Sequence, residues 1–310
     1  MSGAATFSKA AAMNIGKLGV WFFLDGMTAA ETAAYAQKVE RLGYSALWIP
    51  EAVGREPFAH AGYLLSKSEK LILATGIANI WARDPMTMAA AARTLAELSG
   101  GRFVLGIGVS HAPLVERLRG HDYKKPYSYM KDYLAKMKTA MSEPMMYQCV
   151  KPKEDPPILL AALHPKMLAL SASEARGTHT YFVPPEHTAK VRAAIGKEAW
   201  ICAAQAVILE TDAAKARSGA RAYMKTYVPR LPNYTNNLRR LGWKDEEFKD
   251  GCSDRLVDAI VAWGSAEQIR NRIAAHHQAG ATHVCILPLR ADGKPLPDER
   301  ATEALAPLGR

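Results

Sequence analysis

Cysteine is scarce in this chain, and the cysteines that it has are far apart. They are Cys149, Cys202, Cys252 and Cys285, and none belongs to a C-x-x-C pair. This spacing is unlike that of a structural zinc site or of a disulfide-stabilised secreted domain. Cys202 and Cys285 stand inside apolar runs, where buried free thiols are the ordinary outcome. The pattern predicts reduced cysteines and a cytoplasmic protein.

Long apolar runs are also missing. No stretch reaches the roughly 18 apolar residues that a membrane-spanning helix needs. Residues 1–16 are rich in alanine and lack the basic segment and apolar core of a secretory signal. We therefore expect a loose leader over 1–16 and no membrane partner.

Positive charge is in excess but is not concentrated. Lys and Arg number 40 against 30 Asp and Glu, so the net charge is +10. The longest basic runs are the pairs Lys124-Lys125 and Arg239-Arg240, without a nucleic-acid-binding motif beside them. An anionic small ligand or cofactor explains the sign at least as well. We expect no nucleic-acid partner.

Two common hydrolase patterns are absent. No strand-like segment carries the H-x-H pair of metal-dependent hydrolases, and the first such segment ends in Trp21, Phe22 and Phe23 instead. No G-x-S-x-G sequence occurs, which argues against a serine hydrolase of the α/β type. Large aromatic side chains and small neighbours suit a flat aromatic ligand better than a hydrated cation, so we expect no metal site.

The chain does contain a regular alternation of short apolar segments and amphipathic helices. Eight such segments are apolar on both faces, as buried parallel strands are. They cover residues 17–23, 45–50, 71–78, 102–107, 157–163, 178–183, 200–209 and 282–289. This count predicts a (β/α)8 TIM barrel with insertions over 17–290, the largest insertion being a mostly helical one over 211–264. Residues 291–310, rich in Pro and Gly, are expected to wrap the surface.

A doubly wound open sheet is the alternative fold. It would need a G-x-G-x-x-G sequence after an early strand, whereas Gly106 and Gly108 follow the fourth strand and His111 occupies the third glycine position. Because neither glycine has a Cβ, a flat ligand could approach the backbone there. The loop then continues through Ser110.

In a parallel α/β fold the chemistry gathers where the strands end. His111 is placed there and could act as a general acid or base, or could close its loop onto a carbonyl. Glu51 could carry protons or could pair with Arg55 or Arg83. The helix that begins at residue 185 leaves backbone N–H groups free for a phosphate, or is simply capped.

Several sequence segments together resemble the luciferase-like monooxygenase superfamily, and within it the deazaflavin (coenzyme F-420) dependent oxidoreductases of actinobacterial type. The segments are KLGVWFF (17–23), GYSALWIPE (43–51), ATGIAN (74–79), RDP (83–85), GGRFVLGIG (100–108), PKM (165–167) and AGATHV (279–284). The resemblance covers nearly the whole chain. It implies a TIM barrel, commonly dimeric, that holds a flavin or deazaflavin ring at the carboxyl ends of the strands.

The resemblance also implies roles for individual residues. Gly76-Ile77 falls where the family often has a non-prolyl cis peptide behind the ring, and His111 falls where some deazaflavin-dependent members place a glutamate proton donor. Ala52 stands where many members have histidine, and His164 where relatives commonly have glycine. The cofactor-binding residues implied in this way are Gly76, Ile77, Asn79, Gly108, Ser110, Ala161, Ala162, His164, Gly177, His187 and Thr188.

These observations predict an enzyme that transfers hydride between reduced coenzyme F-420 and a small organic substrate, with His111 and Glu51 as catalytic residues. A monooxygenase that uses reduced FMN is the alternative, and a non-catalytic flavin-binding protein is a third possibility. The expected partners are the small-molecule substrate, a second copy of the chain in a homodimer, and a flavin or F-420 reductase.

Overall fold

The structure is a computed structural model that describes residues 13–142 and 149–307. Within these ranges a single sheet contains ten strands, all paired in parallel. The strands are β1 (Leu18–Trp21), β2 (Ala46–Ile49), β3 (Ile72–Thr75), β4 (Ala78–Asn79), β5 (Phe103–Gly108), β6 (Ile158–Ala161), β7 (Gly177–Thr180), β8 (Trp200–Ile208), β9 (Val261–Trp263) and β10 (His283–Pro288).

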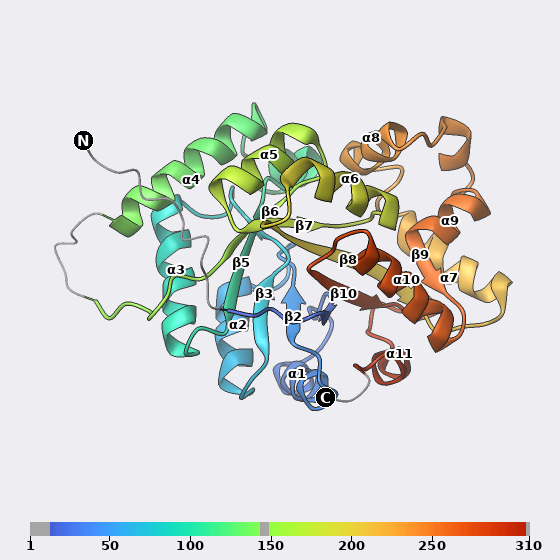
Figure 1. The fold of residues 1–310 in the computed structure, drawn as a ribbon, viewed down its shortest axis with the longest axis horizontal. Coiled ribbons are helices and arrows are strands. Elements are labelled where there is room, and N and C mark those ends of the chain that lie inside the picture. The colour runs from blue at the N-terminus through green and yellow to red at the C-terminus, as the bar shows by residue number, and fades with distance from the viewer. Residues whose placement is uncertain (1–12, 143–148, 308–310) are drawn as a thin grey trace.

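The sheet closes on itself. The strand order is β10-β1-β2-β3-β5-β6-β7-β8, and a further pairing between β8 and β10 joins the two ends. The short strand β4 pairs only with β5, and β9 pairs only with β8. Eight strands therefore form a closed parallel barrel, and the predicted (β/α)8 fold is confirmed (Figure 1). The sequence analysis did not predict β9, which lies inside the expected insertion.

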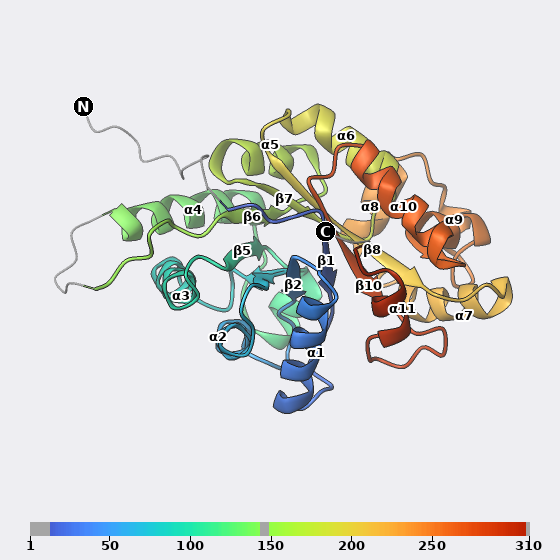
Figure 2. The same cartoon turned by 60° about the horizontal axis from the view of Figure 1, so that its bottom comes forward.

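Helices surround this barrel (Figures 1 and 2). They are α1 (Ala29–Arg41), α2 (Pro57–Ser66), α3 (Pro85–Leu98), α4 (Pro126–Ser142), α5 (Pro165–Glu174), α6 (Pro185–Ile195), α7 (Ala213–Met224), α8 (Pro232–Arg240), α9 (Asp254–Ile260), α10 (Ala266–Gln278) and α11 (Glu299–Ala304), with a π-helical segment η1 (Pro113–Leu118) and a 3-10 turn η2 (Asp245–Phe248). The insertion between β8 and β9 contributes α7, α8 and α9, which gather on one side of the barrel in both views.

The helix boundaries follow the capping residues in the sequence. Thr28 and Ser265 each accept a hydrogen bond from the backbone N–H three residues on, and Glu31 and Gln268 complete a capping box at each of these two helix starts. The Asp84 carboxylate accepts hydrogen bonds from the N–H groups of Met86 and Thr87, which fixes the start of α3.

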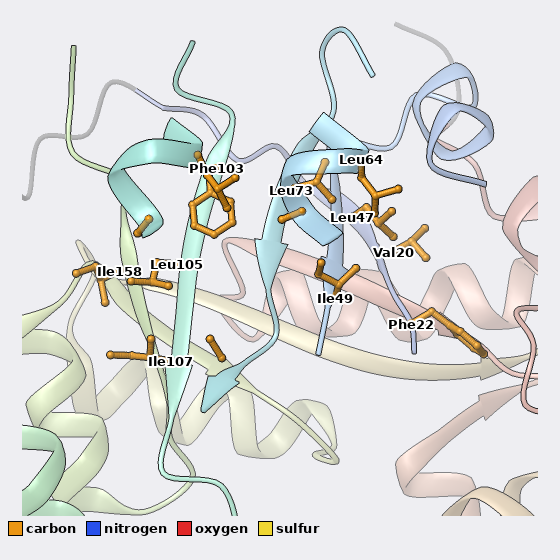
Figure 3. Close-up of a cluster of buried hydrophobic side chains, with 14 of the residues drawn as sticks. Val20, Phe22, Leu47, Ile49, Leu64, Leu73, Phe103, Leu105, Ile107 and Ile158 are labelled. Atoms are coloured by element: carbon orange, nitrogen blue, oxygen red, sulfur yellow. The ribbon is translucent and has the colours of Figure 1, made fainter. Parts of the chain in front are cut away.

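Alternate side chains on each strand point to opposite sides of the barrel wall. One set forms the layer between strands and helices; Figure 3 shows part of it, with Val20, Leu47, Leu73 and Leu105 on successive strands and Leu64 on α2. These five side chains are at most 1% exposed. Because both faces of the strands are buried, the sequence shows continuous apolar runs rather than an alternation.

The barrel interior has a polar aromatic layer that the sequence analysis did not predict. The Trp48 ring lies fully buried and stacks on His179, with ring centroids 4.8 Å apart and planes 10° from parallel. Its indole N–H donates to Nε2 of His283 at 3.1 Å. Two imidazoles and an indole therefore fill space that aliphatic side chains usually occupy in such barrels.

The two ends of the chain contribute more than expected. Ile15 is buried, and the carbonyl oxygen of Gly16 accepts a hydrogen bond from Nδ1 of His283, so the described end of the leader packs onto the barrel; residues 1–12 lie outside the described part. In the tail, α11 buries Ala301 and Leu305, and the Tyr44 hydroxyl donates to the Thr302 carbonyl oxygen. The tail therefore contains a helix, whose apolar side chains dock on the α1–β2 corner.

In the part of the chain that the structure describes, no helix combines the length and the apolar character needed to cross a membrane.

Glycine at position 106 is a packing requirement, which makes it a test of the barrel. A Cβ there would lie 2.0 Å from the Thr75 backbone oxygen. The Thr75 hydroxyl also bridges to Gly106, donating to its carbonyl and accepting from its N–H. Gly106→Ala should lower the free energy of unfolding by about 3 kcal/mol, since overpacking here displaces backbone. Urea denaturation measures this.

Gly26→Ala is the matched control, because a Cβ at Gly26 meets nothing closer than 3.9 Å. Its free energy of unfolding should change by less than about 0.5 kcal/mol. Equal losses in the two variants would show that close packing against Thr75 is not what requires glycine at 106.

Candidate functional site

A cavity of about 470 Å³ opens at the carboxyl ends of the barrel strands. The barrel side of the cavity is lined from four strands: by Trp21 of β1, by Gly76 and Ile77 just after β3, by Ala161 at the end of β6, and by His179 of β7. The opposite wall is formed by the loop after β5 and by the insertion, through His111, Leu231, Asn233 and Tyr234. The cavity has the volume of an ordinary small-molecule or cofactor site.

Most of the predicted site residues meet in this cavity. Those that line it are Glu51, Gly76, Ile77, Ser110, His111, Ala161, Ala162 and His164. The peptide bond between Gly76 and Ile77 is cis, as the resemblance implied. The predicted residues outside the lining are Asn79, Gly108, Gly177, His187 and Thr188.

Gly108 and Asn79 lie one layer behind the cavity wall. A Cβ at Gly108 would come within 2.8 Å of the Ile77 side chain and 3.1 Å of the Ala161 Cβ, so the space beside this glycine is filled by protein. The same is true of Gly106, which meets Thr75. The prediction that a flat ligand approaches these two glycines was wrong: their missing Cβ atoms admit neighbouring strand ends.

Gly177 lies at the far end of its strand. It begins β7, whereas the cavity is at the carboxyl ends, and a Cβ there would be 2.0 Å from the Trp200 carbonyl oxygen. The position needs glycine for strand packing, and the structure does not support its assignment to the cofactor site.

His187 and Thr188 are buried in the first turns of α6 and bond within the protein. His187 donates from Nε2 to the Leu163 carbonyl oxygen at 3.3 Å, and the Thr188 hydroxyl donates to Nδ1 of His276. His276 is itself fully buried and bonds to Gln205. The residues that open α6, Pro184 and Glu186, border a separate hollow of about 340 Å³. Phosphate binding at this turn stays a prediction.

The Glu51 carboxylate is fully hydrogen-bonded by groups of the protein. Arg83 binds both of its oxygens, at 2.8 and 3.0 Å, and Arg119 binds one of them at 3.1 Å. The backbone N–H of Asn79 adds a bond at 2.7 Å, and the Glu51 side chain is only 5% exposed. A carboxylate with this many donors has no lone pair in reach of a substrate proton. The geometry therefore favours the ion pair over the proton carrier, and Glu51 is a positioning residue.

His111 has the opposite character, because few protein groups hold it. Its nearest polar partner is the Asn233 amide, whose Nδ2 lies 3.4 Å from Nδ1, and its ring lies against Tyr234 at 5.2 Å. Burial lowers the pKa of His111 to about 4. At neutral pH the ring is therefore uncharged, and with Asn233 donating to Nδ1 it carries its proton on Nε2.

His164 lies at the rim of the cavity. Its Nδ1 accepts a hydrogen bond from Nη1 of Arg240 at 3.1 Å. Burial, and then the charge of Arg240, lower the pKa of His164. This side chain joins the loop after β6 to α8 of the insertion.

The aromatic wall of the cavity and His179 were not predicted from the sequence. Tyr181, Tyr227 and Tyr234 line the cavity, and the hydroxyls of Tyr181 and Tyr227 are 2.8 Å apart. Tyr181 lies 46 positions before Tyr227 in the sequence, which gave no signal of their meeting. His179 was detectable as a lone imidazole between threonines in an otherwise buried strand.

The cavity fits a planar, mostly apolar ring. Ile77, Ala161, Ala162 and Leu163 present small or aliphatic surfaces, and Trp21 adds an aromatic wall. The buried Nε2 of His179 has no hydrogen-bond partner in the described structure, so the cavity also offers a polar atom that a ligand could satisfy. Among the described residues, no group of three His, Cys, Asp or Glu side chains could hold a metal ion.

Comparison with known families defines the class of protein. The family model for luciferase-like monooxygenases matches residues 6–283, so the chain belongs to this family. The resemblance seen in the sequence, and the class of enzyme that it implied, are confirmed.

Individual relatives narrow the comparison. A coenzyme F-420-dependent oxidoreductase of Mycobacterium tuberculosis, so named, is 26% identical, over 89% of this chain and 95% of its own. The structure of the F-420-dependent tetrahydromethanopterin reductase of Methanopyrus kandleri superimposes with a TM-score of 0.76 at 17% identity, over 94% of this chain and 97% of that one. An F-420-dependent secondary alcohol dehydrogenase, solved with an F-420–acetone adduct, gives a TM-score of 0.74 at 15% identity and the same coverage. These two structures show a shared fold.

Replacing Glu51 tests its positioning role. Glu51→Gln keeps the shape of the side chain but leaves Arg83 and Arg119 without their shared anion. Because breaking a buried ion pair from one side leaves uncompensated charge, the free energy of unfolding should fall by about 3 kcal/mol. Chemical denaturation measures the loss. Asp292→Asn, which breaks the exposed pair with Arg290, is the control and should change it by less than about 1 kcal/mol.

The buried imidazoles predict instability in mild acid. Burial lowers the pKa of His179 and His187 to about 4 and that of His276 and His283 to about 3. In the unfolded chain they take up protons near pH 6.5. Below that pH the unfolded state binds more protons than the folded state. The free energy of unfolding is therefore unaffected by these histidines above pH 6.5 and falls as the pH is lowered towards 4.

Urea midpoints at pH 7.5, 6 and 5 test this linkage. Each such histidine should add a slope of up to ~1.4 kcal/mol per pH unit in this range. A constant midpoint from pH 7.5 to 5 would contradict it.

Proposed function

We propose that this protein transfers hydride between a reduced deazaflavin of the coenzyme F-420 type and a small organic substrate. The observation that carries the proposal is the cavity itself, in which apolar walls and the uncharged imidazole of His111 meet at the carboxyl ends of the strands. The M. tuberculosis relative, which matches almost end to end, supports the choice of deazaflavin over flavin.

The roles of the residues follow from their contacts. Ile77, backed by Gly108, and the small side chains of Ala161 and Ala162 would carry the face of the bound ring. Glu51 would hold the loops after β2 and β3 in place behind it. The ring, when bound, supplies the hydride.

His111 would act on the substrate rather than on the ring. Its Nε2–H can donate to the substrate oxygen, where negative charge gathers as hydride reaches the attached carbon. An uncharged donor at this place is effective because the Tyr234 ring that lies against His111 is only 9% exposed. Asn233, on α8, would fix the tautomer.

The lining also limits the substrate. The lining is predominantly apolar, and its positively charged side chain is that of the exposed Arg230. We propose a small carbonyl compound or its alcohol, uncharged near the reacting carbon.

Cofactor titration is the first test. Purified apoprotein is titrated with oxidised F-420 and, in parallel, with FMN, while the tryptophan fluorescence is followed; Trp21 lines the cavity and should be quenched by a bound ring. We expect the deazaflavin to bind at least about tenfold more tightly, a difference of ~1.4 kcal/mol. Preference for FMN would shift the proposal to oxygen-dependent monooxygenase chemistry, and binding of neither would refute both.

Removal of the His111 imidazole tests turnover. His111→Ala should lower kcat/KM by about 10²-fold, since a positioned hydrogen-bond donor to a developing oxyanion contributes on this order. Affinity for the cofactor should stay within about threefold of the wild type. The assay follows oxidation of reduced F-420 by a panel of small ketones that begins with acetone.

The control is His121→Gln, because this exposed imidazole of the same connection lies outside the cavity lining. Unchanged turnover in His111→Ala would remove the proposed role. Intact cofactor binding without turnover in any variant, the wild type included, would favour the non-catalytic binding protein.

A further inference from the structure

One buried polar atom in the cavity has no role in the function proposed above. It is Nε2 of His179, the third residue of β7, whose side chain is 3% exposed and lines the cavity. The imidazole cannot turn freely, because its ring is stacked on the buried Trp48. The position of Nε2 is therefore set by the barrel interior.

The protein also determines which nitrogen carries the proton. Nδ1 of His179 lies 3.1 Å from the Cys202 carbonyl oxygen, which can only accept, so Nδ1 is the donor. Burial keeps the ring uncharged. Nε2 is left with a lone pair and acts as a hydrogen-bond acceptor.

No protein group satisfies this acceptor within the described structure. Among the donors of the cavity wall, the Trp21 indole N–H bonds to the Gly76 carbonyl oxygen at 2.8 Å, and the Tyr181 and Tyr227 hydroxyls share one hydrogen bond with each other. A buried acceptor without a donor costs stability, so such an atom points to a missing partner.

His283 shows what a satisfied imidazole looks like in the same interior. Its Nε2 accepts the Trp48 indole N–H, and its Nδ1 donates to the Gly16 carbonyl oxygen. It does not line the cavity. Of these two imidazoles, only His179 lines the cavity, and it is the one whose Nε2 lacks a hydrogen-bond partner.

We propose that Nε2 of His179 accepts a hydrogen bond from the imide N–H of the bound deazaflavin or flavin ring. This inference rests on the proposed function. All rings of this class carry an N–H between two carbonyl groups at one end, and an uncharged acceptor suits this uncharged donor. The contact turns the pyrimidine end of the ring towards the barrel and leaves the space beside His111 and Asn233 for the substrate.

The experiment pairs a change in the protein with a change in the ligand. The probes are the riboflavin-level deazaflavin chromophore and the same compound methylated on its imide nitrogen, titrated by tryptophan fluorescence. The wild type should bind the unmethylated probe at least about tenfold more tightly, because methylation removes the donor and leaves Nε2 unpaired. In His179→Leu and His179→Phe the two probes should bind within about twofold of each other.

His283→Leu is the matched control, since it removes a buried imidazole from the same layer but not from the cavity. It should keep the wild-type preference even where its melting temperature falls. A second readout needs no variant: the ¹⁵N resonance of Nε2 of His179 in the wild type should move to lower frequency when the unmethylated probe binds, and not when the methylated one does.

The outcomes separate this inference from the function on which it rests. A wild type that binds both probes equally, a preference that survives in the His179 variants, or an unmoved resonance would overturn the role of His179 while leaving the cofactor in place. A wild type that binds neither deazaflavin nor FMN would overturn the proposed function and this inference with it.

Discussion

The buried carboxylate of Glu51 organises the carboxyl-end rim of the barrel. Glu51 follows β2 directly. Its carboxylate accepts hydrogen bonds from Arg83, which precedes α3, from Arg119, which follows η1, and from the backbone N–H of Asn79 in β4. Segments that follow three different strands are therefore held by one side chain. The order of the loops around the cavity depends on this ion pair, together with the pairing of β4 with β5.

Close backbone packing completes the same region. Gly106 meets the Thr75 carbonyl and Gly108 meets Ile77, so β5 approaches the end of β3 more closely than any other residue type would allow. The Ile77 side chain then faces the cavity, with Ala161 beside it. The apolar platform on which a ring could rest is thus a consequence of two missing Cβ atoms one layer below it.

Two of the three imidazoles that line the cavity, His111 and His179, differ in character. His111 lies in the loop after β5, has Asn233 as a weak hydrogen-bond partner and carries its proton on Nε2. His179 is stacked on Trp48 inside the barrel, donates a hydrogen bond from Nδ1 to the Cys202 carbonyl oxygen and leaves a lone pair on Nε2. Both are uncharged because burial lowers their pKa to about 4. The site can therefore offer a donor and an acceptor without placing a formal charge beside a ring that itself becomes electron-rich on reduction.

The sequence by itself determined the barrel, the helix starts at Thr28, Asp84 and Ser265, and the family, because periodicity, capping and short motifs are local signals. It also marked His111, since a histidine after a strand that ends in glycine is visible in one stretch. Only the tertiary structure decided that Glu51 is bound by Arg83 and Arg119, that Gly108 faces Ile77, and that the insertion brings tyrosines to the cavity. Those contacts join residues that are distant in the chain, and the partner that a side chain finds depends on packing that no local pattern records.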